Sequence, residues 1–231
     1  MRKIKLQIQL SLDGFVCGAG GEMDWLVPDW DDVVKNYVAG LTNSADTFLM
    51  GRATGEGMAV YWPTVQSNPE STEEEKWMAE KLNGSPKIVF SRTVTCINWT
   101  NVRVANDIVE EVKELKREPG KDIILYGGAG IVSSFISENL IDEYHLFVNP
   151  AIIGSGKTIF SDVKKTMYLK LVNAVRSKTG IVILQYVPEK ENEMNSSHKK
   201  QVCETNTKTL NTADFFIKNN VRTDIICSGN R

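Results

Sequence analysis

Three short stretches of the chain combine glycine, arginine and hydroxyl side chains, the groups that commonly hold phosphate oxygens in proteins. Each stretch follows an apolar run typical of a buried strand, so each turn is expected at the carboxyl end of a strand, where ligands of open α/β sheets bind. The turns are FLMGRAT with Gly51, Arg52 and Thr54, IVFSRT with Ser91, Arg92 and Thr93, and LYGGAGIVSSF with Gly127, Gly128, Ala129, Gly130 and Ile131. Three such turns suit a ligand with several phosphates.

The third turn is the strongest of these candidates. Gly127 and Gly128 separate a predicted strand, DIILY, from a predicted helix, AGIVSSFISENL. Glycine lets a phosphate approach the backbone, and the free amides at a helix start favour negative charge. The spacing is not G-x-G-x-x-G, because Ser133 occupies the place of the last glycine. A tight strand-to-helix connection explains the pair about equally well.

A fourth glycine-rich stretch, NPAIIGSGKTIF at residues 149–160, contains the GSGKT ending of a triphosphate-binding loop. The full motif requires a glycine five positions before the Gly-Lys-Thr, and this chain has Ala151 there. A phosphate-binding loop also leads into a helix, whereas the residues that follow alternate like a strand. We therefore do not interpret this stretch as a triphosphate site.

The order of predicted elements favours an α/β fold. Residues 3–12 alternate strictly between polar and apolar side chains, which predicts a first strand. Helices predicted in DWDDVVKNYVAGL, DIVEEVKELKRE and AGIVSSFISENL alternate with strands in TFLMG, KIVFS, DIILYGG and EYHLFVNP. Such alternation implies a mainly parallel sheet flanked by helices. MYLKLVNAVR and GIVILQYV, joined through Gly180, predict a C-terminal antiparallel hairpin.

Composition points to small-molecule partners rather than nucleic acid or a membrane. The formal net charge is -2, with basic residues spread along the chain, so there is no footprint for nucleic acid. No apolar run is long enough to span a membrane, and the N-terminus lacks the apolar core of an export signal. The four cysteines lack the spacing of a metal site or a disulfide framework, so we expect no metal and a reducing cytoplasm.

The composition changes after Pro188. Residues 189–211 are rich in Asn, Thr, Lys and Glu and offer little apolar surface to offset the entropy of ordering. We therefore predict one folded domain at residues 1–188 and a polar linker and tail at residues 189–231. The two histidines, His145 and His198, have no catalytic partner visible in the sequence.

The motifs together resemble the dihydrofolate reductase superfamily, and more closely its branch named for the reductase domain of the bifunctional riboflavin-biosynthesis deaminase-reductase. The matching stretches occur in family order across residues 2–187: QLSLDGFV, MDWL with Trp25, FLMGRAT, IVFSRT, LYGGAGIVSSFI and DEYHLFVNPAIIGSGKTIF. The resemblance implies a dihydrofolate-reductase-like fold, a homodimer, and hydride transfer from NADPH to a C=N or C=O bond of a small heterocyclic substrate.

Roles carried over by the resemblance fall mainly on the three turns. Arg52 and Thr54 would meet the cofactor phosphates, and Ser91 and Arg92, with Thr93 beside them, the region of the adenosine 2'-phosphate. The segment from Gly127 to Ile131 would meet the pyrophosphate. Val16, which follows the Ser-Leu-Asp-Gly turn, would approach the nicotinamide, and GSGKT would lie beside the substrate cleft.

The substrate side departs from true dihydrofolate reductases, which hold the pterin with an acid at the start of the first helix. An ungapped comparison places Trp30 at that position and Val148 at the position of the supporting group. Asp29, Asp31 and Asp32 are near enough to restore an acid, although acids at a helix start also stabilise the helix itself. We take Asp31 as the candidate proton donor and Trp25 and Asp29 as candidate substrate contacts.

Three functions remain open at this point. The leading hypothesis is an NADPH-dependent reductase of the riboflavin-pathway type acting on a pyrimidine- or pterin-like ring; the chain lacks the H-x-E and P-C-x-x-C signature of a deaminase. Dihydrofolate reductase proper is a second enzyme hypothesis, weakened by the missing acid. A non-catalytic NADPH-binding regulatory module is the third, and it would keep the cofactor turns without a competent substrate cleft.

Overall fold

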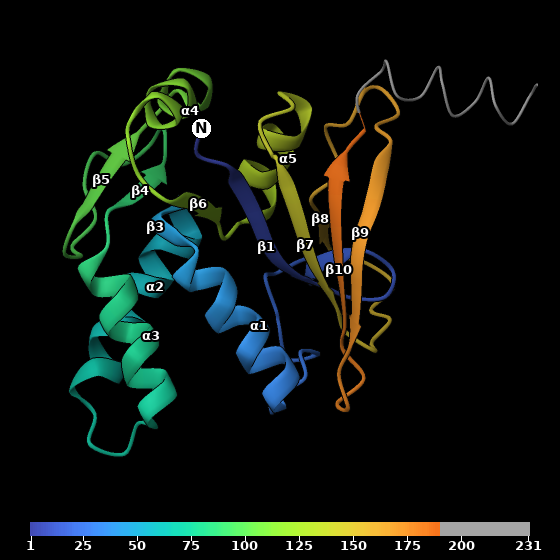
Figure 1. The fold of residues 1–231 in the computed structure, drawn as a ribbon, viewed down its shortest axis with the longest axis horizontal. Coiled ribbons are helices and arrows are strands. Elements are labelled where there is room, and N and C mark those ends of the chain that lie inside the picture. Colours follow the sequence, from blue (N-terminus) through green and yellow to red (C-terminus); the bar gives the residue numbers. More distant parts are fainter. Residues whose placement is uncertain (190–231) are drawn as a thin grey trace, which may run out of the picture. The chain divides into compact units, whose positions relative to one another are not determined.

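The computed structural model describes residues 1–189 of the chain (Figure 1). Within them, an eight-stranded sheet has the order β5-β4-β3-β6-β1-β7-β10-β9. Its strands are β1 (Ile4–Leu10), β3 (Ala45–Gly51), β4 (Lys87–Phe90), β5 (Val102–Ala105), β6 (Asp122–Leu125), β7 (Glu143–Val148), β9 (Leu169–Arg176) and β10 (Val182–Pro188). A second small sheet pairs β2 (Phe15–Cys17) with β8 (Lys157–Thr158).

The strands from β5 to β7 run parallel, and β10 is antiparallel to both β7 and β9. This arrangement confirms the predicted α/β class, with its mainly parallel sheet and its C-terminal antiparallel hairpin. The hairpin turn contains Gly180, whose φ of +92° lies in the left-handed region that glycine adopts without strain. The alternation of β1 places Ile4, Leu6, Ile8 and Leu10 in one core cluster.

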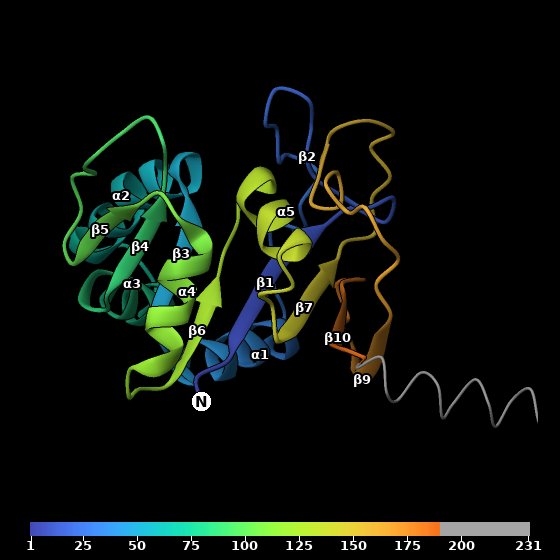
Figure 2. The same ribbon diagram turned by 90° about the horizontal axis from the view of Figure 1, so that it is seen from above.

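Helices cover both faces of the sheet (Figures 1 and 2). On one face lie α1 (Asp32–Asn43), α2 (Arg52–Ser67) and α3 (Glu73–Gly84), and on the other lie α4 (Ile108–Arg117) and α5 (Ala129–Ser137). The α1 helix buries Val34, Val38 and Leu41, which have the spacing of one helical face. Side chains of α5 such as Val132 and Phe135 pack into the same core cluster as β1.

The carboxyl ends of β3 and β6 lead at once into helices. Gly51 at the end of β3 is the N-cap of α2, and Gly128 after β6 is the N-cap of α5. The Gly51 backbone N–H donates to the Gly127 carbonyl over 2.6 Å, which joins the two turns. The sheet therefore holds two helix N-termini side by side at the carboxyl ends of the neighbouring strands β3 and β6.

Contacts group Met1–Pro188 into one unit. The predicted polar linker and tail, and His198 with them, lie outside the described residues apart from Glu189, so the domain boundary stays a prediction. Among residues 1–189, no helix is both long and apolar enough to cross a membrane. That same part of the chain holds no group of three or more His, Cys, Asp or Glu side chains arranged for a metal ion.

Candidate functional site

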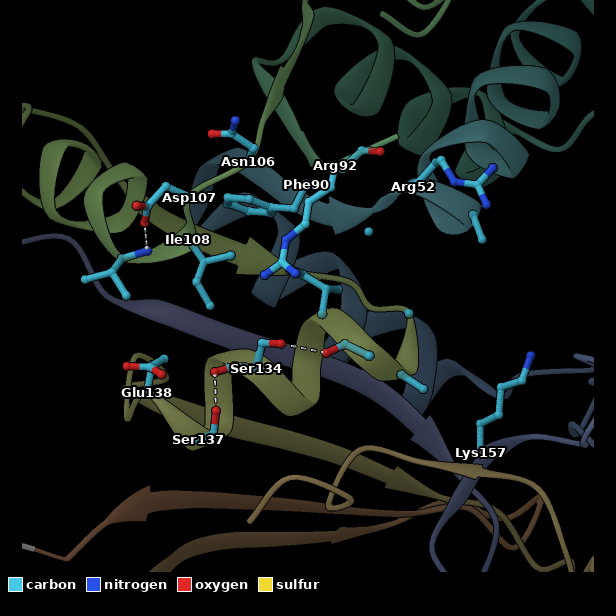
Figure 3. A pocket seen from close by; sticks show the side chains of 18 residues that line it. Arg52, Phe90, Arg92, Asn106, Asp107, Ile108, Ser134, Ser137, Glu138 and Lys157 are labelled. Carbon is cyan, nitrogen blue, oxygen red and sulfur yellow. Dashed lines mark hydrogen bonds between the residues drawn. The ribbon is translucent and has the colours of Figure 1, made fainter. Parts of the chain in front are cut away.

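A cavity of about 720 Å³ lies where the carboxyl ends of β3, β4 and β6 meet the starts of α2, α4 and α5 (Figure 3). All three turns singled out in the sequence contribute to its wall. Their lining residues are Gly51, Arg52, Ala53, Phe90, Ser91, Arg92, Gly128, Ala129, Gly130, Ile131 and Ser134. The topology therefore brings together stretches that are about forty residues apart in sequence, in the manner expected of a ligand site in an open α/β sheet.

Backbone amides at two helix starts face this cavity. Neither α2 nor α5 has a side chain that caps its N-terminus, because the N-cap residues are Gly51 and Gly128. The first amides of a helix have no partner within the helix, and the helix dipole adds partial positive charge there. Two uncapped helix starts at one cavity form a binding surface for phosphate oxygens.

Three cationic side chains add full charges to the cavity wall. The Arg92 guanidinium points into the middle of the cavity (Figure 3), and no hydrogen bond or ion pair within residues 1–189 involves its side chain. Arg52 is directed to one side, where its Nη1 lies 3.1 Å and 3.2 Å from the two carboxylate oxygens of Glu56. Lys157 reaches the cavity from β8. Arg92 is therefore the cation best placed to meet a ligand.

Four of the predicted cofactor residues do not line the cavity. Gly127 is buried and Thr93 is exposed just beyond it, while Val16 is 7% exposed and packs in the core. Thr54 lies next to a lining residue, since a Cβ placed on Gly128 would be 3.5 Å from the Thr54 Oγ1 atom. Their predicted roles, including that of Val16 at the nicotinamide, stay predictions.

The Ser91 hydroxyl organises its own turn. Its Oγ accepts hydrogen bonds from the Thr93 and Val94 amides, each over 3.1 Å, and lies 3.3 Å from the Thr93 hydroxyl. This local network presents Arg92, the residue between them, toward the cavity. Ser91 thus acts on the site at least partly through the shape of the turn.

Sequence reasoning missed a further side of the cavity, formed by Asn106, Asp107, Ile108 and Val109, together with Ser137 and Glu138. Lys157, from the GSGKT stretch that was expected beside the substrate cleft, lines this cavity instead. The rule that found the other turns applies to Asn106–Ile108 as well, because these residues follow β5 and begin α4. Asp107 gave a visible helix-start signal, and it does cap α4, accepting from the Val109 and Glu110 amides over 2.9 Å and 3.1 Å. The short strand before it was not recognised, so the turn was not placed at the sheet edge.

A second cavity, of about 640 Å³, lies between α1 and α3. Three indoles, those of Trp30, Trp62 and Trp77, line it together with Met78 and the predicted substrate residue Asp29. Trp25, the other predicted substrate residue, is half-buried and is not among the residues lining either of these cavities. Its contact with a substrate stays a prediction.

Asp31, the candidate proton donor, is the N-cap of α1. Its Oδ1 accepts from the Val34 amide over 3.1 Å, and its Oδ2 accepts from the Lys178 amide over 2.7 Å. Desolvation acts to raise the pKa of this carboxyl, but the hydrogen bonds from the Lys178 and Val34 amides outweigh it and hold the pKa below its ordinary value. A carboxylate that is ionised and bonded at both oxygens is well suited to capping a helix and less suited to giving up a proton.

The Asp31→Asn variant tests the proton-donor role, which stays a prediction. Asn caps helices about as well as Asp, so the fold should be retained. The role predicts a loss of turnover of roughly a hundredfold or more, the usual contribution of a general acid, with NADPH affinity unchanged. Single-turnover kinetics and a cofactor titration measure the two quantities. Unchanged turnover would leave Asp31 as a helix cap, with water or the substrate supplying the proton.

His145 has partners that the sequence did not reveal. Its Nδ1 lies 2.8 Å from the Tyr37 hydroxyl of α1, and its Nε2 lies 3.3 Å from Glu143, which is bonded in turn to Lys3 over 2.7 Å. The hydrogen bond to His145 and the bond from Lys3 lower the pKa of Glu143 to about 2, against the opposing effect of burial. Burial raises the pKa of Tyr37 to about 12. The chain of groups lies between α1 and the sheet and does not line either cavity, so we interpret it as a support for α1.

The sheet order and the cavity at the two joined helix starts define a dihydrofolate-reductase-like α/β protein. Residues 2–183 match the family model for the RibD C-terminal domain, and the chain belongs to this family. The family supports a reductase function.

Among curated proteins, YyaP of Bacillus subtilis is 38% identical over 185 residues, which is 80% of this chain and 94% of YyaP. YwjB of the same organism is 30% identical over 170 residues, covering 74% of this chain and 89% of YwjB. The riboflavin biosynthesis protein RibD of Corynebacterium ammoniagenes is 22% identical over 159 residues, and the match spans 46% of that longer protein.

Solved structures show the same fold at lower identity. A putative riboflavin biosynthesis protein of Shewanella sp. PV-4 superposes with a TM-score of 0.62 at 21% identity, over 82% of this chain and 100% of that one. The diaminohydroxyphosphoribosylaminopyrimidine deaminase/5-amino-6-(5-phosphoribosylamino)uracil reductase of Thermotoga maritima gives 0.57 at 18%, over 81% of this chain and 57% of that one. Dihydrofolate reductase of Enterococcus faecalis, complexed with NADP(H), gives 0.53 at 14%, over 81% and 97%.

Proposed function

We propose that the protein is an NADPH-dependent reductase that transfers hydride to a small heterocyclic substrate of the pyrimidine or pterin type. The observation that carries this proposal is the cavity at the joined starts of α2 and α5, with Arg92 directed into it. Family membership supports the reductase class, and the Enterococcus faecalis relative of the same fold is described as complexed with NADP(H).

The residues present fit this cofactor. Gly128 leaves the backbone open beside the amides of α5. A Cβ on Gly51 would lie 3.1 Å from Ile131 Cγ2, so a side chain there would press on the lining residue Ile131. A pyrophosphate is suited to the amides of the two helix starts, and a 2'-phosphate to Arg92. When bound, the nicotinamide supplies the hydride. The protein's own part is to orient the cofactor, to hold the substrate ring beside it and to limit access of water.

Two assays test the proposal. Oxidation of NADPH, followed by its absorbance against a panel of pyrimidines, pterins and flavins, should reveal turnover with one class of ring. Turnover of dihydrofolate alone would favour dihydrofolate reductase proper. Tight NADPH binding without turnover of any of these rings would favour a regulatory module. Failure to bind NADPH at all would refute the proposal.

We further propose that the reaction takes place in the cytoplasm. The cysteine spacing of the sequence supports a reducing compartment, and we propose small molecules rather than nucleic acid or membranes as the partners.

We also propose that the protein forms a homodimer, and the position of β9 supports this. This strand forms the edge of the main sheet, and its Leu171 and Val172 side chains are about half exposed. Exposed edge strands with apolar side chains pair readily with another chain. Sedimentation equilibrium at micromolar concentration should therefore give twice the monomer mass, and Val172→Lys should shift the protein toward monomer. Val60→Lys, at an exposed position on α2, is the matched control and should not. A wild-type protein that sediments only as monomer would refute the dimer.

A further inference from the structure

The cavity between α1 and α3 has walls of aromatic side chains held in place by the core. Trp62 packs against the core cluster that includes Leu41 and Leu82. Trp30 and Met78 pack against the cluster that includes Val34 and Val38. Indoles that line a cavity and are fixed by the core in this way can contact a flat ring without a further cost of ordering.

The rim of this cavity is strongly acidic. Four carboxylates line it, from Asp29, Asp32, Glu74 and Glu75, against the single cation of Lys35. The starts of α1 and α3 also lie here, and each helix dipole adds roughly half a positive charge. Even with both dipoles counted, the formal balance stays about two charges negative.

Most of these carboxylates remain available to a ligand. Glu75 is engaged in the capping box of α3, where it accepts from the Thr72 amide over 2.8 Å. Within residues 1–189, no hydrogen bond or ion pair involves the side chains of Asp29, Asp32 or Glu74. The cavity therefore offers acceptors and negative charge next to aromatic faces.

This combination selects one chemical class of ligand. Indole faces attract cations and electron-poor rings, and nearby carboxylates accept hydrogen bonds from ring amino groups. A phosphate group would be repelled by the same carboxylates. The charge of this cavity is thus opposite to that of the cofactor cavity, where Arg52, Arg92 and Lys157 outnumber Asp107 and Glu138.

The Thermotoga maritima relative is described as a reductase of a phosphoribosylamino-uracil, a substrate that carries a phosphate. We propose that the cavity between α1 and α3 holds the substrate ring of this protein, and that this ring carries amino groups or a positive charge and no phosphate. The assignment of the ring as substrate rests on the proposed reductase function. The two cavities share α2 as a wall, with Arg52 in its first turn and Trp62 ten positions later, about 15 Å along the axis.

A binding experiment tests the charge of the ligand without using turnover. Calorimetric titration of the full chain at pH 8 with N-methylquinolinium, a permanent cation, is compared with titration by quinoline, a neutral ring of similar shape. We expect the cation to bind about tenfold more tightly. The double variant Asp29→Asn and Glu74→Gln should remove most of this preference. Glu73→Gln is the matched control, because Glu73 precedes Glu74 on α3 but does not line the cavity.

Turnover then tests the absence of phosphate. The value of kcat/KM for 5-amino-6-ribosylaminouracil is expected to exceed that for its 5'-phosphate by about tenfold or more. A preference for the phosphate ester, equal binding of the two quinolines, or equal loss in Glu73→Gln would each overturn the inference while leaving the reductase intact. Absence of NADPH binding, with the cation still bound through Asp29 and Glu74, would instead count against the reductase function alone.

Discussion

The Arg92→Ala variant is expected to weaken NADPH binding about ten- to a hundredfold and to change NADH binding little. Hydrogen bonds to charged groups contribute roughly 1.5 to 3 kcal/mol, and each 1.4 kcal/mol is about tenfold in affinity. The two cofactors differ only in the 2'-phosphate, so a contact to that group appears in one titration and not in the other. The wild-type protein should accordingly prefer NADPH by a similar factor.

The structure makes Arg92 the better of the two candidate arginines for this contact. Its guanidinium points into the cavity, whereas Arg52 is paired with Glu56 at the surface and would have to leave that pair. Such exposed pairs contribute little to stability, so Arg52 can still leave Glu56 and approach a phosphate. We expect it to contribute less than Arg92 to the difference in affinity between NADPH and NADH.

Fluorescence titration of both cofactors against both proteins measures the effect. Arg117→Ala is a suitable control, since Arg117 is an exposed arginine at the far end of α4 and does not line the cavity. Equal affinities of the wild-type protein for NADPH and NADH would remove the assignment of these arginines. A parallel loss of both cofactors in Arg92→Ala would place Arg92 at the pyrophosphate instead.

Much of the fold follows from local patterns in the sequence. The alternation that predicts β1, the buried runs of β3, β4, β6 and β7, and the turn at Gly180 each have a local physical cause, and the structure contains all of these elements. The predicted first strand is too long at its C-terminal end, since β1 ends at Leu10 and Leu12 is 63% exposed. The grouping of the three turns around one cavity was predictable for the same reason. Ligands gather at the carboxyl ends of parallel strands, so residues found one turn at a time are brought together by the topology.

Residues 55–67 show where local patterns fail. The α2 helix contains Gly55, Gly57 and Pro63, all poor helix formers, so its sequence lacks a helical signature. It forms nonetheless because it packs on the sheet, and Gly55 permits close approach: a Cβ there would lie 2.7 Å from Val89 Cγ2. The α3 helix, in contrast, begins with a readable signal, the capping box of Thr72 and Glu75, so its omission from the predicted elements had no physical cause. Tryptophans alone suggested a pocket for a flat ring, but without these two helices Trp62 and Trp77 could not be placed beside Trp30.

The partners of His145 were hidden for a related reason. Tyr37 is 108 positions away along the chain, and Glu143 lies two positions away on the same face of β7. The first contact depends on how α1 packs across the sheet, which no local pattern specifies. The second follows from the period of a strand and was available to sequence reasoning.

The affinity of the Gly128→Leu variant for both NADPH and NADH is expected to be lower than that of the wild-type protein by about a hundredfold or more. Gly128 lines the cavity at the start of α5, where a leucine side chain would occupy the space beside the helix amides. Loss of two hydrogen bonds to a charged pyrophosphate is sufficient for an effect of this size. Since the pyrophosphate is common to both cofactors, the variant should not change the ratio of their affinities, in contrast to Arg92→Ala.

The backbone at Gly128 should tolerate this substitution. Its φ of -66° and ψ of 179° are open to any residue, and a Cβ would make an ordinary contact of 3.5 Å with Thr54 Oγ1. Gly127 differs, because its φ of +117° would strain any side chain and confuse loss of binding with loss of fold. Circular dichroism and thermal unfolding should therefore show a folded Gly128→Leu protein.

Two companion variants separate obstruction from other causes. Gly128→Ala adds only a methyl group and should retain most of the affinity, while Gly57→Leu adds the same bulk at an open position of α2 outside the cavity and should leave both cofactors unaffected. A folded Gly128→Leu protein that still bound NADPH with wild-type affinity would exclude the start of α5 as the pyrophosphate site. The reductase proposal would then lose its main support, because it places the cofactor at the two helix starts that Gly51 and Gly127 join.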